Sequence, residues 1–169
     1  MSTVGRFLTG AAVLALMLGA STYSAQSAAA KPQLISTLVG TWNCSYTGPK
    51  GTLTSTITFT SLNDMWLQDT EKDGKYGDRP AHTAFGFFGY DSKKHQYVSM
   101  GGSTLPGDYG VGTAAASPET SDMTFVGAYP ADPTHDKTVF HFGATKVTSV
   151  DTWTEKGKAM TGHGVCTKQ

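Results

Sequence analysis

The sequence predicts an all-β protein, an antiparallel up-and-down β-barrel of about ten strands preceded by a short N-terminal helical turn. Segments rich in Thr, Val, Phe, Tyr and Trp follow residue 40, separated by turn signals at roughly eight- to twelve-residue intervals. Beyond residue 38 no segment has a convincing helical period, so crossover helices between parallel strands are not expected. A meander of short strands avoids exposed edges best by closing on itself, which favours a barrel.

The start of the chain has the pattern of a secretory signal peptide. Arg6 precedes an apolar run that is too short to span a bilayer comfortably. Small residues follow, and Ala30 ends an A-x-A cleavage site, with Ala25 as an alternative cleavage position. We therefore predict a leader over residues 1–30 and a single barrel domain over residues 31–169, exported to the periplasm or secreted, and soluble.

The charge of the mature chain excludes two classes of partner. Without the leader, 12 basic residues stand against 13 acidic ones. This balance offers no electrostatic basis for binding nucleic acid or a membrane surface, and no long apolar segment predicts membrane insertion. The oligomeric state stays open.

The elements follow in order along the mature chain. Residues 31–38 predict one or two helical turns, because Leu34, Ile35 and Leu38 recur at helical spacing. The strands are expected at residues 40–47, 52–60, 65–71, 81–90, 96–101, 108–116, 122–129, 137–144, 149–155 and 159–167. Glycines inside these strands predict sharp bends or close approaches of neighbouring backbones; they are Gly86, Gly110, Gly112, Gly127, Gly143, Gly162 and Gly164.

The two cysteines predict a bond that closes the barrel. In an exported chain, Cys44 and Cys166 favour one disulfide over a metal-binding pair, since no Cys-x-x-Cys is present. Cys44 shares a strand face with Trp42 and Tyr46, and Cys166 shares one with Met160. Since the first and last strands of a meander barrel are neighbours, this disulfide would join them at the seam.

The opening strand and a later turn resemble a known group of barrels. Residues 38–42 (LVGTW) resemble the Gly-x-Trp start of calycin-superfamily barrels. Residues 88–98 (FGYDSKKHQYV) and 124–127 (TFVG) are similar to a bacterial family of exported calycin-like proteins of unknown function. The resemblance implies a lipocalin-like barrel and brings no settled activity.

The nitrobindin-like haem barrels share the Gly-x-Trp start more distantly. That resemblance implies a haem held by a histidine late in the chain, for which the candidate is His163. The strand alternation places His163 opposite to Cys166, and therefore outside the barrel if Trp42 points inward, unless a bulge resets the register.

No catalytic motif is recognisable, and we expect a protein that is not an enzyme, without cofactor or metal. The five histidines have no metal-ligand spacing, and no Gly-x-Ser-x-Gly elbow or phosphate-binding loop occurs. His141, between Phe140 and Phe142, is either exposed or a single polar anchor in a cavity. Residues 69–74 resemble the start of a calcium loop, but Pro80 occupies the position that needs a bidentate Glu, which favours an acidic hairpin loop.

The aromatic residues on the strands leave three functional hypotheses. The first is non-catalytic binding of a small, largely apolar molecule inside the barrel. Its candidate lining residues are Trp42, Met123, Phe125, Trp153 and Met160. The second is a haem or metal site that uses His163 or His141. The third is an exported structural or interaction domain whose aromatic residues fill the core.

Overall fold

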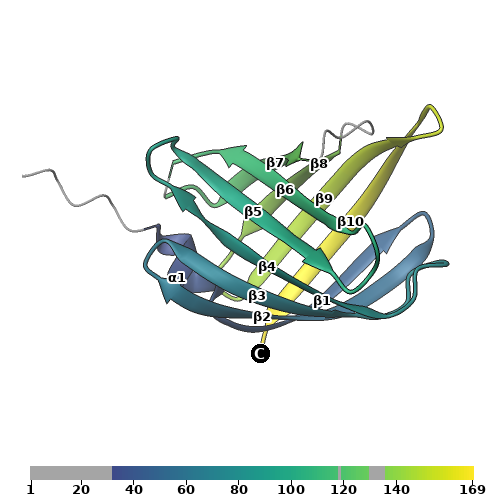
Figure 1. The fold of residues 1–169 in the computed structure, drawn as a ribbon, viewed down its shortest axis with the longest axis horizontal. Coiled ribbons are helices and arrows are strands. Elements are labelled where there is room, and N and C mark those ends of the chain that lie inside the picture. The colour runs from purple at the N-terminus through teal and green to yellow at the C-terminus, as the bar shows by residue number, and fades with distance from the viewer. Residues whose placement is uncertain (1–31, 118, 130–135) are drawn as a thin grey trace, which may run out of the picture.

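A computed structural model describes residues 32–117, 119–129 and 136–169 and shows a closed antiparallel barrel (Figure 1). Its ten strands pair in chain order, and β1 and β10 pair with each other to complete the circle. The predicted fold class is confirmed, including the short helix before the first strand. The predicted leader lies outside the described residues.

All ten predicted strands are present, with different limits for several. Their bounds are β1 Gly40–Gly48, β2 Gly51–Asn63, β3 Trp66–Asp73, β4 His82–Asp91, β5 Gln96–Ser103, β6 Tyr109–Ala115, β7 Asp122–Tyr129, β8 Lys137–Phe142, β9 Lys146–Glu155 and β10 Lys158–Lys168. β9 begins three residues earlier than predicted because Lys146 pairs with Thr167. β8 ends before Gly143, which was wrongly placed inside a strand.

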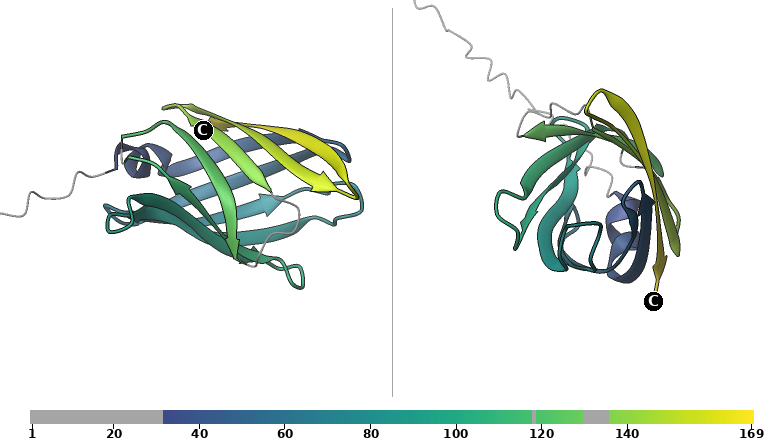
Figure 2. Two further views of the ribbon diagram at one scale, coloured as in Figure 1. Left: turned by 90° about the horizontal axis from the view of Figure 1, so that it is seen from above. Right: turned by 90° about the vertical axis from the view of Figure 1, so that its right-hand side faces the viewer.

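Helix α1, Gln33–Leu38, closes one end of the barrel (Figures 1 and 2). Its apolar residues are buried, and its last carbonyl groups are bonded by groups from the barrel. The Trp42 indole Nε1 donates to the Leu38 carbonyl at 2.7 Å, and Lys168 Nζ donates to the Thr37 carbonyl at 2.8 Å. The Gly-x-Trp start therefore joins the helix to the first strand. The described part of the chain contains no helix with the length and apolar character needed to cross a bilayer.

Gly40 makes this junction sterically feasible. Its φ of +122° is strongly disfavoured for residues with a side chain, and it turns the chain from α1 into β1. A Cβ at this position would also approach Lys168 Cε to 3.2 Å. The Lys168 ammonium group lies 5.4 Å from the Trp42 ring centroid, so the two side chains pack together over the junction.

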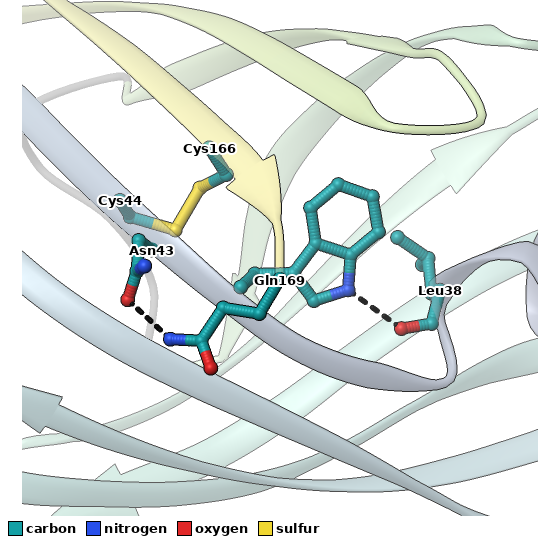
Figure 3. The surroundings of a disulfide bond; sticks show 6 residues. Leu38, Asn43, Cys44, Cys166 and Gln169 are labelled. Carbon is teal, nitrogen blue, oxygen red and sulfur yellow. Dashed lines mark hydrogen bonds between the residues drawn. A yellow bond between two sulfur atoms is a disulfide. The ribbon is translucent and has the colours of Figure 1, made fainter.

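The seam between β1 and β10 carries the predicted disulfide (Figure 3). Cys44 and Cys166 are directly paired residues with Cα atoms 4.0 Å apart. Close by, Gln169 Nε2 donates to Asn43 Oδ1 at 2.8 Å. The bond ties together strands whose cysteines are 122 residues apart in sequence.

The side chains of each strand alternate between the interior and the outer surface. Trp42 and Cys44 face inward on β1. On β4, Phe88 points inward, whereas Phe85 and Phe87 are exposed on the outside. The sequence alone did not distinguish these faces, because phenylalanines occur on both.

The hydrophobic core lies at the α1 end of the barrel. Phe88 stacks on Tyr97 with ring centroids 5.6 Å apart, and Tyr90 lies 4.9 Å from Tyr97. Its buried members are Leu34, Ile35, Leu38, Trp42, Leu67, Phe88, Tyr90, Tyr97, Ala114, Met123, Phe125 and Val147. The rest of the interior is therefore left to other side chains and to a cavity.

Candidate functional site

A cavity of about 480 Å³ occupies the barrel beyond this core. Its wall combines aromatic rings, glycines and carboxyl groups from β2 to β8. The lining residues are Leu38, Ile57, Phe59, Asp69, Glu71, Phe88, Ser99, Gly110, Val111, Gly112, Phe125, Val126, Gly127, Asp136, Thr138, Phe140 and Phe142. A depression of about 460 Å³ near Trp66 and Tyr90 is lined mainly by residues of the β2–β3 and β4–β5 turns. The barrel cavity is the better candidate, because ligand sites are concave and mostly apolar.

Glycines on β6 and β7 create much of the free space. Gly110, Gly112 and Gly127 line the cavity and contribute no side chain to fill it. A Cβ added at Gly112 would make ordinary contacts, 3.5 Å from the Val126 carbonyl oxygen and 3.6 Å from the Phe125 ring. The backbone would therefore tolerate a side chain at this position, and its absence leaves the volume open.

Phenylalanines form the apolar part of the wall. Phe140 stacks on Phe142 with ring centroids 5.2 Å apart, and Phe125 meets Phe140 edge to face at 5.8 Å. Phe88 lies 6.0 Å from Phe125. Rings held by one another in this way form a preorganised apolar surface that a ligand can contact without ordering it first.

Strand β3 contributes a row of carboxyl groups that the sequence interpretation missed. Asp69, Glu71 and Asp73 follow the fully buried Leu67 at alternate positions and share its inward face. The interpretation of residues 69–74 as an acidic hairpin loop was wrong, since β3 extends to Asp73. Their two-residue spacing in phase with Leu67 was the signal that could have placed them inside.

Burial raises the pKa of two of these carboxyl groups, Asp69 and Glu71. Burial is the largest cause that raises the pKa of Glu71 to about 7; Asp73 raises it further by its charge and by a hydrogen bond, while a Ser55 hydrogen bond opposes the rise. Burial also raises the pKa of Asp69. No basic side chain occurs among the described residues that line the cavity.

Basic groups are instead held at the rim. Arg79 Nη2 binds Asp108 Oδ2 at 2.5 Å, which links the β3–β4 loop to the β5–β6 loop. His82 Nε2 lies 3.1 Å from Asp73 Oδ2, and these two side chains are only 3% and 8% exposed. His82 Nε2 also lies 2.8 Å from Arg79. This network satisfies one oxygen of Asp73 at the rim, whereas Asp69 and Glu71 have no basic side chain beside them among the described residues that line the cavity.

Tyr46 fills the interior near the rim. Its ring lies over Gly162, where an added Cβ would approach the Tyr46 hydroxyl oxygen to 1.9 Å, and it meets Tyr76 edge to face at 5.8 Å. Burial, together with the charge of Asp151, raises the pKa of Tyr46. Tyr46 therefore stays protonated at neutral pH and can donate a hydrogen bond to Asp151.

The five predicted lining residues occupy three different places. Phe125 lines the cavity. Trp42 and Met123, 1% and 3% exposed, belong to the packed core at the α1 end. Trp153 and Met160 are paired neighbours beside the β9–β10 turn, are half-buried, and are not among the residues that line the cavity. Ring size and strand alternation predicted which side chains point into the barrel, but not how far along the barrel axis each one lies.

The two histidines of the haem or metal hypothesis lie on the outer surface. His141 is exposed and its Nδ1 lies 2.5 Å from Asp122 Oδ1. His163 is exposed between Thr47 of β1 and Val150 of β9. No histidine lines the cavity within the described part of the chain, so these side chains do not fit a haem held inside. Residues 32–117, 119–129 and 136–169 also contain no cluster of three His, Cys, Asp or Glu side chains that could hold a metal ion.

The fold and the cavity together define the class of protein: a ten-stranded antiparallel barrel with an internal, partly acidic cavity. No family model matches the chain, and no curated protein matches it. Similarity to solved structures is found at the level of the fold.

Three solved structures illustrate this similarity. Rv2717c from M. tuberculosis has a TM-score of 0.59 at 13% identity, over 81% of this chain and 96% of that one. The S-type phycobiliprotein lyase CPES from Guillardia theta has a TM-score of 0.53 at 11% identity, over 80% and 90% of the two chains. EF1p2_mFAP2b bound to DFHBI has a TM-score of 0.50 at 10% identity, over 83% and 100%. At such low identity these likenesses establish the barrel fold alone.

Proposed function

We propose that this protein is an exported binding protein that holds a small, largely apolar molecule inside its barrel without transforming it. The observation that carries the proposal is the cavity of about 480 Å³ with its phenylalanine wall. This volume lies within the range of roughly 300–1,000 Å³ that is common for small-molecule sites. A filled core would not leave room for a side chain at Gly112.

The lining also supports binding without catalysis. Its hydroxyl groups, on Ser99 and Thr138, have no histidine beside them among the described lining residues. A nucleophile without an adjacent general base is weakly reactive.

A barrel of the same architecture supports the proposal by example. EF1p2_mFAP2b is bound to DFHBI in its structure, so a fold of this kind can hold a small molecule. Export is supported by the leader pattern in the sequence and by the disulfide between Cys44 and Cys166. Expression of the full chain, followed by cell fractionation and mass measurement of the exported product, tests the predicted cleavage after Ala30.

Binding is tested with N-phenyl-1-naphthylamine, a neutral dye whose fluorescence rises in apolar surroundings. We expect saturable enhancement with residues 31–169 and a loss of at least about tenfold in affinity when Gly112→Leu fills the cavity. Ser99→Leu offers a second filling variant on β5. The matched control is Thr113→Leu, which adds the same side chain on the opposite face of β6 and should leave dye binding unchanged. Absence of saturable binding by the folded wild-type protein would overturn the proposal and favour a filled core.

A further inference from the structure

We propose that the ligand of this cavity is an organic cation, a protonated amine attached to an apolar body. This inference rests on the proposed function and specifies the chemistry of its ligand. The geometry points to it because carboxyl groups and aromatic faces line the same space, and the described residues of the lining include no basic group beside Asp69 and Glu71. A bound ammonium group would supply the missing positive charge.

The acidic wall is built into the barrel by strand alternation. Asp69 and Glu71 line the cavity at successive inward-facing positions of β3, and Asp73 is the next inward-facing residue. The Asp73 side chain is 8% exposed, and its Oδ1 atom is buried and receives no hydrogen bond unless the Glu71 carboxyl is protonated. Buried carboxylates are costly unless a cation or several donors accompany them. Asp69 and Glu71 therefore lie beside the cavity in a setting where a bound cation would stabilise their ionised forms.

The aromatic part of the lining suits the ligand's charge and its apolar body. Phe88, Phe125, Phe140 and Phe142 form a connected set of rings, with neighbouring centroids 5.2–6.3 Å apart. Aromatic faces attract ammonium groups through their quadrupole and contact hydrocarbon through dispersion and burial. A neutral apolar ligand would use these rings but leave Asp69 and Glu71 unpaired.

An inorganic cation fits the same wall less well. Calcium requires six to eight oxygen ligands that converge on one point. Side chains at alternate positions of one extended strand stand side by side, and the described residues contain no convergent group of three that could hold a metal ion. An elongated organic cation can place its head on one carboxylate and its body on the phenylalanines.

Three probes with one apolar body and different heads test the inference. They are 4-phenylbutylamine, 4-phenylbutanol and 4-phenylbutyrate, each competing with the neutral dye at pH 8, where the amine is protonated. We expect the amine to bind about tenfold more tightly than the alcohol, and the carboxylate to bind most weakly. Equal affinity of amine and alcohol, with the dye still bound, would overturn the cation inference and leave the binding function intact. Failure of the dye and of all three probes would overturn both.

Charge-removing variants locate the preference. Glu71→Gln and Asp69→Asn should each reduce the amine-to-alcohol affinity ratio at least about threefold while the alcohol itself binds as before. Glu119→Gln is the matched control, because it removes the same charge from the exposed turn between β6 and β7, at the end of the barrel away from Glu71. An amine preference that survives both cavity substitutions, or that falls equally with Glu119→Gln, would contradict the assignment of these carboxyls.

Discussion

Glu71 and Asp73 occupy successive inward-facing positions of β3, and their carboxyl groups share a hydrogen bond that requires a proton. Ionising both neighbouring carboxyl groups is costly in a partly buried site, because their negative charges repel. The barrel therefore keeps a proton on Glu71 up to a pH of about 7, and binding of a cation would release it. The protonation of this pair therefore affects both the stability of the empty barrel and its expected affinity for a cation.

Stability should fall as the pH rises through the titration of Glu71. Its pKa rises from 4.5 in the unfolded chain to about 7 in the fold, so the folded state binds the extra proton between these values. The stabilisation is complete below pH 4.5 and is lost as the pH passes 7. We expect wild-type stability to fall by roughly 3 kcal/mol over this range and expect Glu71→Gln to abolish that decrease. Urea unfolding of both proteins from pH 4 to 8 measures it, and identical pH profiles would contradict the assignment.

Amine binding should show the opposite pH dependence. A cation prefers the ionised carboxylate, so 4-phenylbutylamine should bind more tightly as the pH rises from 5.5 to 8, while 4-phenylbutanol stays nearly constant. The titratable groups of the same interior are Asp69 and Asp73 on the strand of Glu71, His82 on β4, Asp136 before β8, Tyr46 on β1 and Asp151 on β9. Since several of these groups lie close to Glu71, Glu71→Gln is the deciding control. A rise in affinity with pH that persists in this variant belongs to another group.

The Cys44–Cys166 bond should contribute substantially to stability. A cross-link over a loop of this length is worth up to about 5 kcal/mol in the chain-entropy model. Replacement of both cysteines by alanine should lower the free energy of unfolding towards this amount, as measured in urea with and without reductant. Reductant should destabilise the wild-type protein and leave the double variant unchanged. Two free thiols in oxidised protein would refute the closed seam.

The Trp42 indole should be required for docking of α1. Trp42→Phe keeps an aromatic ring but removes the donor to the Leu38 carbonyl and leaves that buried group unpaired. We expect a loss of about 1–3 kcal/mol in thermal or urea unfolding. Trp153→Phe, in a half-buried position near the other end, should cost less than about 1 kcal/mol. A smaller cost at Trp42 than at Trp153 would refute the capping role.

Two inward-facing glycines on neighbouring strands should respond differently to alanine. A Cβ at Gly101 would approach the Phe85 carbonyl oxygen to 2.5 Å, whereas one at Gly112 meets nothing closer than 3.5 Å. Gly101→Ala should therefore destabilise the barrel by about 1–3 kcal/mol, and Gly112→Ala should be nearly neutral. Parallel melting curves compare them. Equal effects would mean that the close approach of β4 and β5 relaxes easily.

The fold was predictable because its signals are local. The strand composition and recurring turns indicated ten antiparallel strands, and the alternation of Trp42, Cys44 and Cys166 indicated a closed seam. The same alternation placed His163 on the face opposite to Cys166, where the structure has it. Strand ends were harder: β9 begins at Lys146 because a partner strand extends that far, which composition does not reveal.

The candidate site was predictable only in part. Phe125 lines the cavity, but Trp42 and Met123 lie in the packed core and Trp153 and Met160 near the rim. Alternation tells which side chains point inward and not how the strands are staggered along the barrel axis. That stagger decides which inward-facing residues share a level, and it is fixed by pairing across all ten strands.

Strand β1 shows most clearly which features follow from the sequence and which only the tertiary structure decided. By itself the sequence indicated the barrel class, the shared face of Trp42 and Cys44, and the pairing of Cys44 with Cys166. These follow from the recurring strands and turns, from a two-residue period and from the number of cysteines. Only the tertiary structure decided that Trp42 bonds α1 and packs in the core, and that Asp69 and Glu71 face the phenylalanines across an open space. The reason is physical: an acidic strand segment and a solvated loop can have the same local composition, and only closure of the barrel determines which carboxyl groups lose contact with water.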